Sequence, residues 1–230
     1  MKSPSLDWLF LDAGNTLVHL DFVRVAEILR AETGFDGDPA LMESAEPHAR
    51  LHVDGARLDA DGERKRWHAY FWTILSAAGW LDRALIPDAL RTLFRVNQTF
   101  TLWSRPGRGA EETLRNLKNL GYRLAVISNS DGSVEGMLDR LGLKAHLEFV
   151  IDSKIVGIEK PDPRIFRMAL QQSGADPARA LYVGDMFHID VLGARSVGMD
   201  AVLMDPADLH TERKCRRVRE ISELPAILTP

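Results

Sequence analysis

The chain has 230 residues, of which 45% are hydrophobic and 27% charged, and its net charge is −4 at pH 7. This balance is ordinary for a globular protein, and the negative charge argues against binding to nucleic acid or to an anionic membrane surface. The single cysteine, Cys215, excludes an internal disulfide framework and a cysteine-rich metal site. The N-terminus lacks the residue order of a secretory signal, and no apolar run reaches the ~20 residues that span a bilayer. We therefore expect a soluble, cytoplasmic protein.

Short apolar runs that each end in a polar residue predict buried parallel strands. They lie at residues 7–12, 123–129, 180–185 and 200–205, with a weaker run at 147–152. Helical patterns alternate with these strands, at residues 109–120, 133–141, 162–173 and 187–197. This alternation predicts an α/β fold with a doubly wound, parallel, Rossmann-like sheet.

Residues 18–105 interrupt the alternation. They carry four helical patterns, near 21–33, 40–52, 62–79 and 87–100, and no convincing strand. An aromatic cluster gives the segment an apolar core of its own, made of Trp67, Tyr70, Phe71, Trp72 and Trp80. We expect two domains, an α/β core of residues 1–17 and 106–230 and an inserted helical domain of residues 18–105. The basic run at 210–220 is interpreted as the solvated face of a helix.

Polar residues at the ends of the predicted strands are the candidates for a functional site, since ligands of an open α/β sheet bind outside the carboxyl ends of its strands. These candidates are Asp12, Ser128, Asn129, Asp185, Asp190 and, in the loop GIEKPDP, Lys160. They provide a carboxylate nucleophile, a hydroxyl donor, a cation and two further acids. Any one of them alone is equally explained as a helix N-cap. Capping does not account for the whole set in this order.

The set resembles the motifs of the haloacid dehalogenase (HAD) superfamily. The family's first motif, an apolar strand followed by D-x-D-x-T, corresponds to Asp12-Ala13-Gly14-Asn15-Thr16. The second, a strand ending in Ser or Thr, corresponds to Ser128, the third to Lys160, and the fourth to Gly184-Asp185 with Asp190. The helical insertion resembles the family's C1-type cap. The stretches SNSDGSVEGMLDRLGL, KPDPRIF and YVGD are most similar to the REG-2-like or HDHD3-like branch.

The resemblance implies a Mg²⁺-dependent hydrolase, most similar to a phosphatase that acts on a small phosphorylated substrate. Asp12 would attack phosphorus and form an aspartyl-phosphate intermediate. Ser128, Asn129 and Lys160 would bind the phosphoryl group, with Lys160 neutralising its charge. Asp12, Asp185 and the backbone carbonyl of Gly14 would hold the metal.

Two further residues have supporting roles in this interpretation. Asp190 would orient the groups around the metal rather than bind it. Thr16 would tighten the turn after the nucleophile through a hydrogen bond to the backbone.

Gly14 is a departure from the phosphatases of the family, which carry a second aspartate there. That aspartate protonates the leaving group and then activates the hydrolytic water. A positioned acid/base is typically worth about 10²–10⁴-fold in rate. We therefore expect the loss to be largest for poor alkoxide leaving groups and smallest for aryl or acyl phosphates.

Three explanations of Gly14 remain open. In the first, a histidine replaces the missing group; the candidates are His19, His48, His52 and His68. In the second, the protein is a near-inactive member that binds a phosphorylated ligand or a partner. In the third, the reaction is not on phosphorus. Haloacid dehalogenases of the family also lack the second aspartate, but Gly184-Asp185 here resembles the metal-binding form of the fourth motif. Phosphonoacetaldehyde hydrolases need a lysine in the cap, and Lys65 in GERKR is the one candidate for it.

Overall fold

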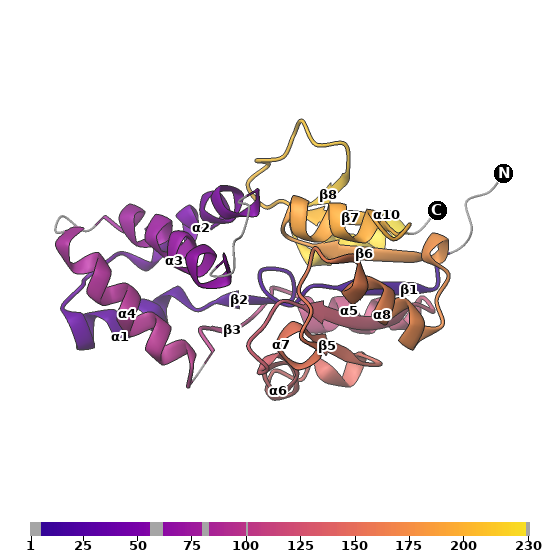
Figure 1. The fold of residues 1–230 in the computed structure, drawn as a ribbon, viewed down its shortest axis with the longest axis horizontal. Helices are drawn as coiled ribbons and strands as arrows, with labels where there is room; N and C mark the ends of the chain where they lie inside the picture. Colours follow the sequence, from indigo (N-terminus) through magenta and orange to yellow (C-terminus); the bar gives the residue numbers. More distant parts are fainter. Residues whose placement is uncertain (1–5, 56–61, 80–82, 100, 229–230) are drawn as a thin grey trace. The chain divides into compact units, whose positions relative to one another are not determined.

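The structure, a computed structural model, describes residues 6–55, 62–79, 83–99 and 101–228. The chain divides into two compact units, one of Met1–His19 with Arg105–Pro230 and one of Leu20–Ser104. Figure 1 shows the sheet in the first unit and helices α1 to α4 in the second. Of the residues in the predicted aromatic cluster, Trp80 lies outside the described residues.

The first unit contains a six-stranded sheet in the order β5-β4-β1-β6-β7-β8, and every pair of neighbouring strands is parallel. The strands are β1 Trp8–Leu11, β4 Arg123–Ser128, β5 Val150–Asp152, β6 Ala180–Gly184, β7 Asp200–Met204 and β8 Arg216–Val218. β1 and β6 are buried along their whole length. This arrangement confirms the predicted α/β fold with a parallel, Rossmann-like sheet.

Helices follow the strands, as the alternating pattern predicts. They are α5 Ala110–Asn119, α6 Val134–Arg140, α7 Ser153–Val156, α8 Pro163–Ser173, the π-helical turn η4 Phe187–Val191, α9 Leu192–Arg195 and α10 Leu224–Leu228. Because successive strand residues face opposite sides, Phe10 and Tyr182 lie on one face of the sheet. There they belong to a core cluster with Ile165 and Phe166 of α8. This face carries the side chains beneath the candidate site.

The second unit consists of helices α1 Phe22–Thr33, α2 Pro39–Asp54, α3 Gly62–Ala77, η1 Arg83–Leu85 and α4 Ile86–Asn97. The rings of Trp67 and Phe71 are 4.4 Å apart between centroids, and Trp103 lies 6.0 Å from Phe71. These contacts support the predicted aromatic core. The prediction is wrong for Trp72, which is 41% exposed and stacks against the ring of His68.

Two sequence predictions of secondary structure are wrong. Residues 18–105 were expected to hold no strand, but β2 Val18–Leu20 and β3 Trp103–Pro106 form a two-stranded sheet, too short to stand out in the pattern. The basic run at 210–220 contains no helix but the strand β8. Its charges suit an edge strand, and Arg217 forms an ion pair with the buried Asp205. Within the described ranges, no helix is long and apolar enough to cross a membrane.

Candidate active site

Asp12 directly follows β1, which lies between β4 and β6 in the sheet. Its backbone N–H donates to the carbonyl of Val183 at 2.8 Å, and this bond extends the pairing of β1 with β6 by one residue. The chain then turns, with the N–H groups of Leu17 and Val18 both donating to the carbonyl of Ala13 at 2.9 Å. Asn15 adopts a left-handed backbone, at φ 52°. The turn holds the Asp12 carboxylate at the carboxyl edge of the sheet, where it is 7% exposed.

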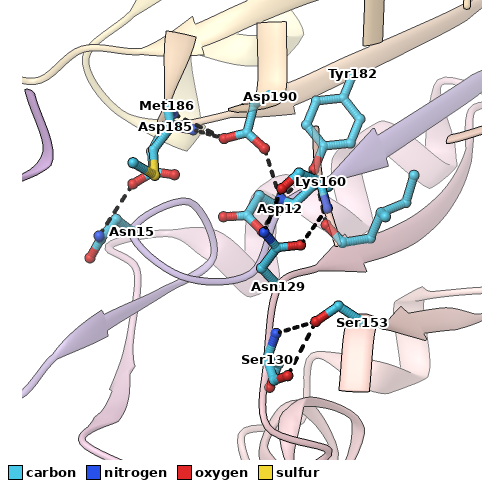
Figure 2. A network of polar contacts seen from close by, with 11 residues as sticks. Asp12, Asn15, Asn129, Ser130, Ser153, Lys160, Tyr182, Asp185, Met186 and Asp190 are labelled. Carbon is cyan, nitrogen blue, oxygen red and sulfur yellow. Dashed lines mark hydrogen bonds and ion pairs between the residues drawn. The ribbon is translucent and has the colours of Figure 1, made fainter. Parts of the chain in front are cut away.

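The Lys160 ammonium lies at the centre of the polar cluster (Figure 2). Its Nζ donates to Asp12 Oδ1 at 2.7 Å, to Asp190 Oδ1 at 2.7 Å and to the Tyr182 hydroxyl at 2.9 Å. A lysine ammonium has three N–H donors and no acceptor. All three donors are therefore engaged by protein groups, and the Lys160 side chain is only 2% exposed.

The buried charges shift one another's pKa values. Burial raises the pKa of the Asp12 carboxyl; Lys160 opposes this shift and Asp190 adds to it. Burial by itself would lower the pKa of Lys160, but Asp12 and Asp190 outweigh it and hold that pKa above its usual value. Burial, with the nearby Asp190 and Asp12 charges, raises the pKa of the Tyr182 phenol. At neutral pH the lysine is therefore charged and the tyrosine is neutral.

Asp190 connects this cluster to the loop after β6. Its second oxygen, Oδ2, accepts from the backbone N–H groups of Asp185 at 3.1 Å and Met186 at 2.9 Å. Both Asp190 oxygens are thus bonded to protein groups. A Cβ on Gly184 would lie 2.4 Å from Asp190 Cγ, so the close approach of this carboxylate requires glycine at position 184.

Asn129 and Ser128 lie at the end of β4. The Asn129 amide donates from Nδ2 to the Lys160 carbonyl at 2.9 Å and accepts from the Lys160 N–H at 2.8 Å. It therefore fixes the backbone of Lys160, which the sequence pattern did not reveal. Ser128 is the last residue of β4 and is buried. Because Leu11 is paired with Val126, Ser128 lies one residue beyond the level of Asp12 on the adjacent strand.

The expected hydrogen bond of the Thr16 hydroxyl is contradicted. Among the described residues this hydroxyl has no hydrogen-bond partner, although Thr16 is fully buried. The turn is closed instead by backbone bonds to Ala13. Its compactness comes from the backbone, so no side-chain hydroxyl is needed there.

Two residues of this cluster do not stand out in the sequence. Tyr182 lies in the middle of β6, where an apolar strand pattern gives no reason to single out a phenol. Asn15 donates from Nδ2 to Asp185 Oδ2 at 3.2 Å and so joins the turn after β1 to the loop after β6. The signal for Asn15 was its place in the turn, where asparagine tolerates a left-handed backbone better than most residues.

Carboxylate oxygens from Asp12, Asp185 and Asp190 lie within 4.8 Å of one another, all from buried side chains. Three carboxylates against the one ammonium of Lys160 leave an excess of two negative charges in the cluster. An oxygen-only set with this charge suits a hard divalent cation such as Mg²⁺. The donor set therefore fits the metal that the family motifs imply.

The Gly184→Ala substitution should destabilise the protein by about 1–3 kcal/mol, because the new methyl group overlaps Asp190 and forces it away from Lys160. Chemical unfolding measures the change. Gly136→Ala in α6 is the matched control, since the nearest atom to its new Cβ is 3.6 Å away. It should be neutral or stabilise by about 0.5–1 kcal/mol. Equal effects of the two substitutions would show that Asp190 does not require this glycine.

The Thr16→Val substitution should stabilise the protein by about 1 kcal/mol, because it replaces a buried hydroxyl that lacks a partner by a methyl group of similar shape. Thr16→Ser keeps the hydroxyl and removes the methyl, so it should destabilise by about 1 kcal/mol. Both are read from thermal or urea unfolding. A destabilised Thr16→Val protein would mean that the hydroxyl does form a hydrogen bond in solution.

Comparisons with known proteins agree with this geometry. The sequence model of the haloacid dehalogenase-like hydrolase family matches residues 6–198. The human haloacid dehalogenase-like hydrolase domain-containing protein 3 is 49% identical over 143 residues, which are 57% of this chain and 57% of that protein. A glyceraldehyde 3-phosphate phosphatase of Methanothermobacter thermautotrophicus is 42% identical over 110 residues, 47% of this chain and 49% of the relative. The chain thus spans about half the length of these curated relatives.

A solved structure supports the same fold. The HAD-hydrolase YfnB of Bacillus subtilis, in a crystal form bound to magnesium, superposes with a TM-score of 0.70 at 19% identity, covering 99% of this chain and 100% of the other. At this identity the likeness concerns the fold alone. The family match extends over most of the chain and includes all four motifs at the carboxyl edge of the sheet. The chain belongs to the haloacid dehalogenase-like hydrolase family.

Proposed function

We propose that the protein is a Mg²⁺-dependent phosphatase that acts through Asp12 on a small phosphorylated substrate. The observation that carries this proposal is the position of the Asp12 carboxylate. It directly follows β1, and its Oδ1 accepts a hydrogen bond from Lys160 Nζ at 2.7 Å. One oxygen is fixed and charge-balanced, which leaves the other for bond formation. The phosphatase activity in the name of the archaeal relative supports phosphate as the substrate class.

In the first step, the second Asp12 oxygen forms a bond to phosphorus, and the bond from phosphorus to the leaving oxygen breaks. The leaving oxygen takes the electron pair and, because position 14 is glycine, it receives its proton from solvent. A second step follows, in which water attacks phosphorus and releases orthophosphate and the free carboxylate. Before the first step, the positive charge of Lys160 favours the ionised Asp12 carboxylate, whereas burial raises the pKa of that carboxyl.

We assign metal binding to Asp12, Asp185 and the backbone carbonyl of Gly14, with Asp190 as the residue that positions them. The assignment of Asp190 follows from its hydrogen bonds, since both of its oxygens already accept from protein donors. Mg²⁺ bound there would supply positive charge against the repulsion between a carboxylate and a phosphate. Asn15 would hold Asp185 in orientation through its amide.

Ser128 is proposed to donate to a phosphoryl oxygen, in line with its place beside Asp12 at the edge of the sheet. Asn129 is better assigned to positioning, because its amide is bonded to both backbone groups of Lys160. The family resemblance instead implies a contact between Asn129 and the substrate. We also propose that the helical unit, Leu20–Ser104, is the cap of the family and that the other unit is its catalytic core.

Hydrolysis of an activated aryl phosphate tests the proposal. Wild type should turn over slowly and only with Mg²⁺, whereas Asp12→Asn should be inactive because it lacks the nucleophile. Gly14→Asp should raise the rate by about 10²-fold or more for an alkyl phosphate, and by less for an aryl phosphate, because good leaving groups need less protonation. Asp139→Asn, at an exposed position of α6, is the control for the loss of one carboxylate and should leave the rate unchanged.

The alternative functions give different results in the same assay. Binding of Mg²⁺ and orthophosphate without turnover of any phosphate ester would contradict the proposal and identify a protein that binds a phosphorylated ligand or a partner. Release of halide from a 2-haloacid in the presence of a chelator would identify a carbon–halogen hydrolase. If Gly14→Asp gave the same rates as wild type, the vacancy at position 14 would not be what limits turnover.

A further inference from the structure

The loop after β4, residues 130–133, is held mainly by residues at the end of β5. It directly follows Ser128 and Asn129 and leads into α6. Ser133 is the N-cap residue of α6, but its side chain forms no capping hydrogen bond and its hydroxyl donates instead to Asp131. The backbone N–H groups at the start of α6 therefore need acceptors from elsewhere in the fold.

Asp152 supplies these acceptors. It is the last residue of β5, is paired with Ser128 of β4, and is 3% exposed. Its Oδ2 accepts from the N–H groups of Gly132 at 3.0 Å and Val134 at 3.4 Å, and its Oδ1 accepts from the N–H of Lys154 at 2.9 Å. Burial of a carboxylate is costly unless it is hydrogen-bonded, so these backbone donors stabilise Asp152 where it lies.

Ser153, the next residue, holds the beginning of the same loop (Figure 2). Its Oγ accepts from the N–H of Ser130 at 3.1 Å and donates to the carbonyl of Ser130 at 3.2 Å. Both backbone groups of Ser130 are thus bonded to one buried side chain. Asp152 and Ser153 therefore fix the loop at both of its ends.

The position of this loop matters for the residues at the end of β4. The pairing of β4 with β1 ends at Val126 and its pairing with β5 ends at Ser128, so strand pairing does not fix the chain beyond Ser128. A shift of the loop would therefore move the Ser128 hydroxyl. A misplacement of about 1 Å can cost about 10²-fold in rate.

We propose that Asp152 is a positioning residue of the active site, which fixes the loop after β4 and so holds the Ser128 hydroxyl against the phosphoryl group. This inference rests on the proposed function, in which Ser128 donates to that group. The role requires a carboxylate, because the two oxygens of Asp152 serve N–H donors on different segments, the start of α6 and the start of α7. An asparagine would present its own N–H₂ group to one of them.

The Asp152→Ala substitution tests this role, because it removes all of these acceptors. Orthophosphate should bind about tenfold more weakly in the presence of Mg²⁺, as measured by calorimetry, because the bond from Ser128 is misaligned. KM for an aryl phosphate should rise by a similar factor and kcat should fall by less than about threefold, since a bond made equally to substrate and transition state changes KM rather than kcat. Asp152→Asn should lie between wild type and Asp152→Ala. A purely structural role would lower the binding stoichiometry and the apparent kcat, and would leave the Kd for orthophosphate unchanged.

A double-mutant cycle with Ser128→Ala identifies the route of the effect. By itself, Ser128→Ala should weaken orthophosphate binding by about tenfold or more, because it removes a hydrogen bond to a charged group. Adding Asp152→Ala to this variant should change the Kd by less than about threefold, since the proposed effect acts through the Ser128 hydroxyl.

Asp176→Ala is the matched control. The Asp176 carboxylate also accepts from a backbone N–H, that of Ala178 at 2.9 Å, but it caps the turn that precedes β6 at the amino edge of the sheet. Orthophosphate affinity and kcat should both stay within about twofold of wild type, as expected for a surface position distant from the site.

Three results would overturn the inference: equal orthophosphate affinity in wild type and Asp152→Ala, full multiplication of the two effects in the double variant, or no orthophosphate binding by wild type. If Asp152→Ala does not fold, Asp152→Asn and Ser153→Ala replace it in the same comparison. If wild type binds orthophosphate but hydrolyses no phosphate ester, the proposed function fails, and the comparison of affinities still decides the role of Asp152.

Discussion

The arrangement at the carboxyl edge of the sheet depends on one buried cation. Lys160 is almost inaccessible to water, and an ammonium in such a place is costly unless it is paired and hydrogen-bonded. Asp12 and Asp190 supply the opposite charges, and Tyr182 supplies the third acceptor. Removing any one of these partners would leave a buried donor unsatisfied. The same contacts that make burial of the lysine possible also fix Asp12, the proposed nucleophile.

The other contacts of the site support this centre. Asn129 holds the Lys160 backbone from β4, and the glycine at position 184 lets Asp190 approach the chain. With three carboxylates and one ammonium, the cluster keeps an excess of negative charge that favours a divalent cation. Positioning and charge are what phosphoryl transfer mainly requires of a protein. The contacts of Lys160 thus supply both the positioning and the charge that the proposed chemistry requires.

Much of the fold was predictable from the sequence, because buried parallel strands and the helices between them leave strong periodic patterns. β8 was missed because its two arginines suggested a solvated helix face, whereas Arg216 and Arg217 form ion pairs with Asp200 and Asp205. β2 and β3 were missed because three or four residues are too few for a pattern. Their pairing depends on contacts between residues far apart in the chain, which periodicity does not reveal.

The sequence predicts which residues lie at the candidate site, but not which of them are hydrogen-bonded to one another. Strand ends place Asp12, Ser128 and Asp185 at one edge, and the parallel sheet then brings them together. The partners of a hydrogen bond are set by the tertiary structure, so Tyr182 looked like a core residue and Asn129 like a ligand for substrate. Thr16 shows the opposite case, in which a residue type typical of turns makes no side-chain hydrogen bond among the described residues.

The missing carboxylate at position 14 has a consequence that can be observed directly. Because position 14 is glycine, hydrolysis of the proposed aspartyl phosphate should be slower than its formation from a good leaving group, so the intermediate should accumulate. Rapid acid quenching after mixing with excess aryl phosphate, followed by mass spectrometry of the peptides, measures this. The account predicts one phosphoryl group on the peptide that contains Asp12. Turnover without any modified Asp12 under saturating substrate would contradict it.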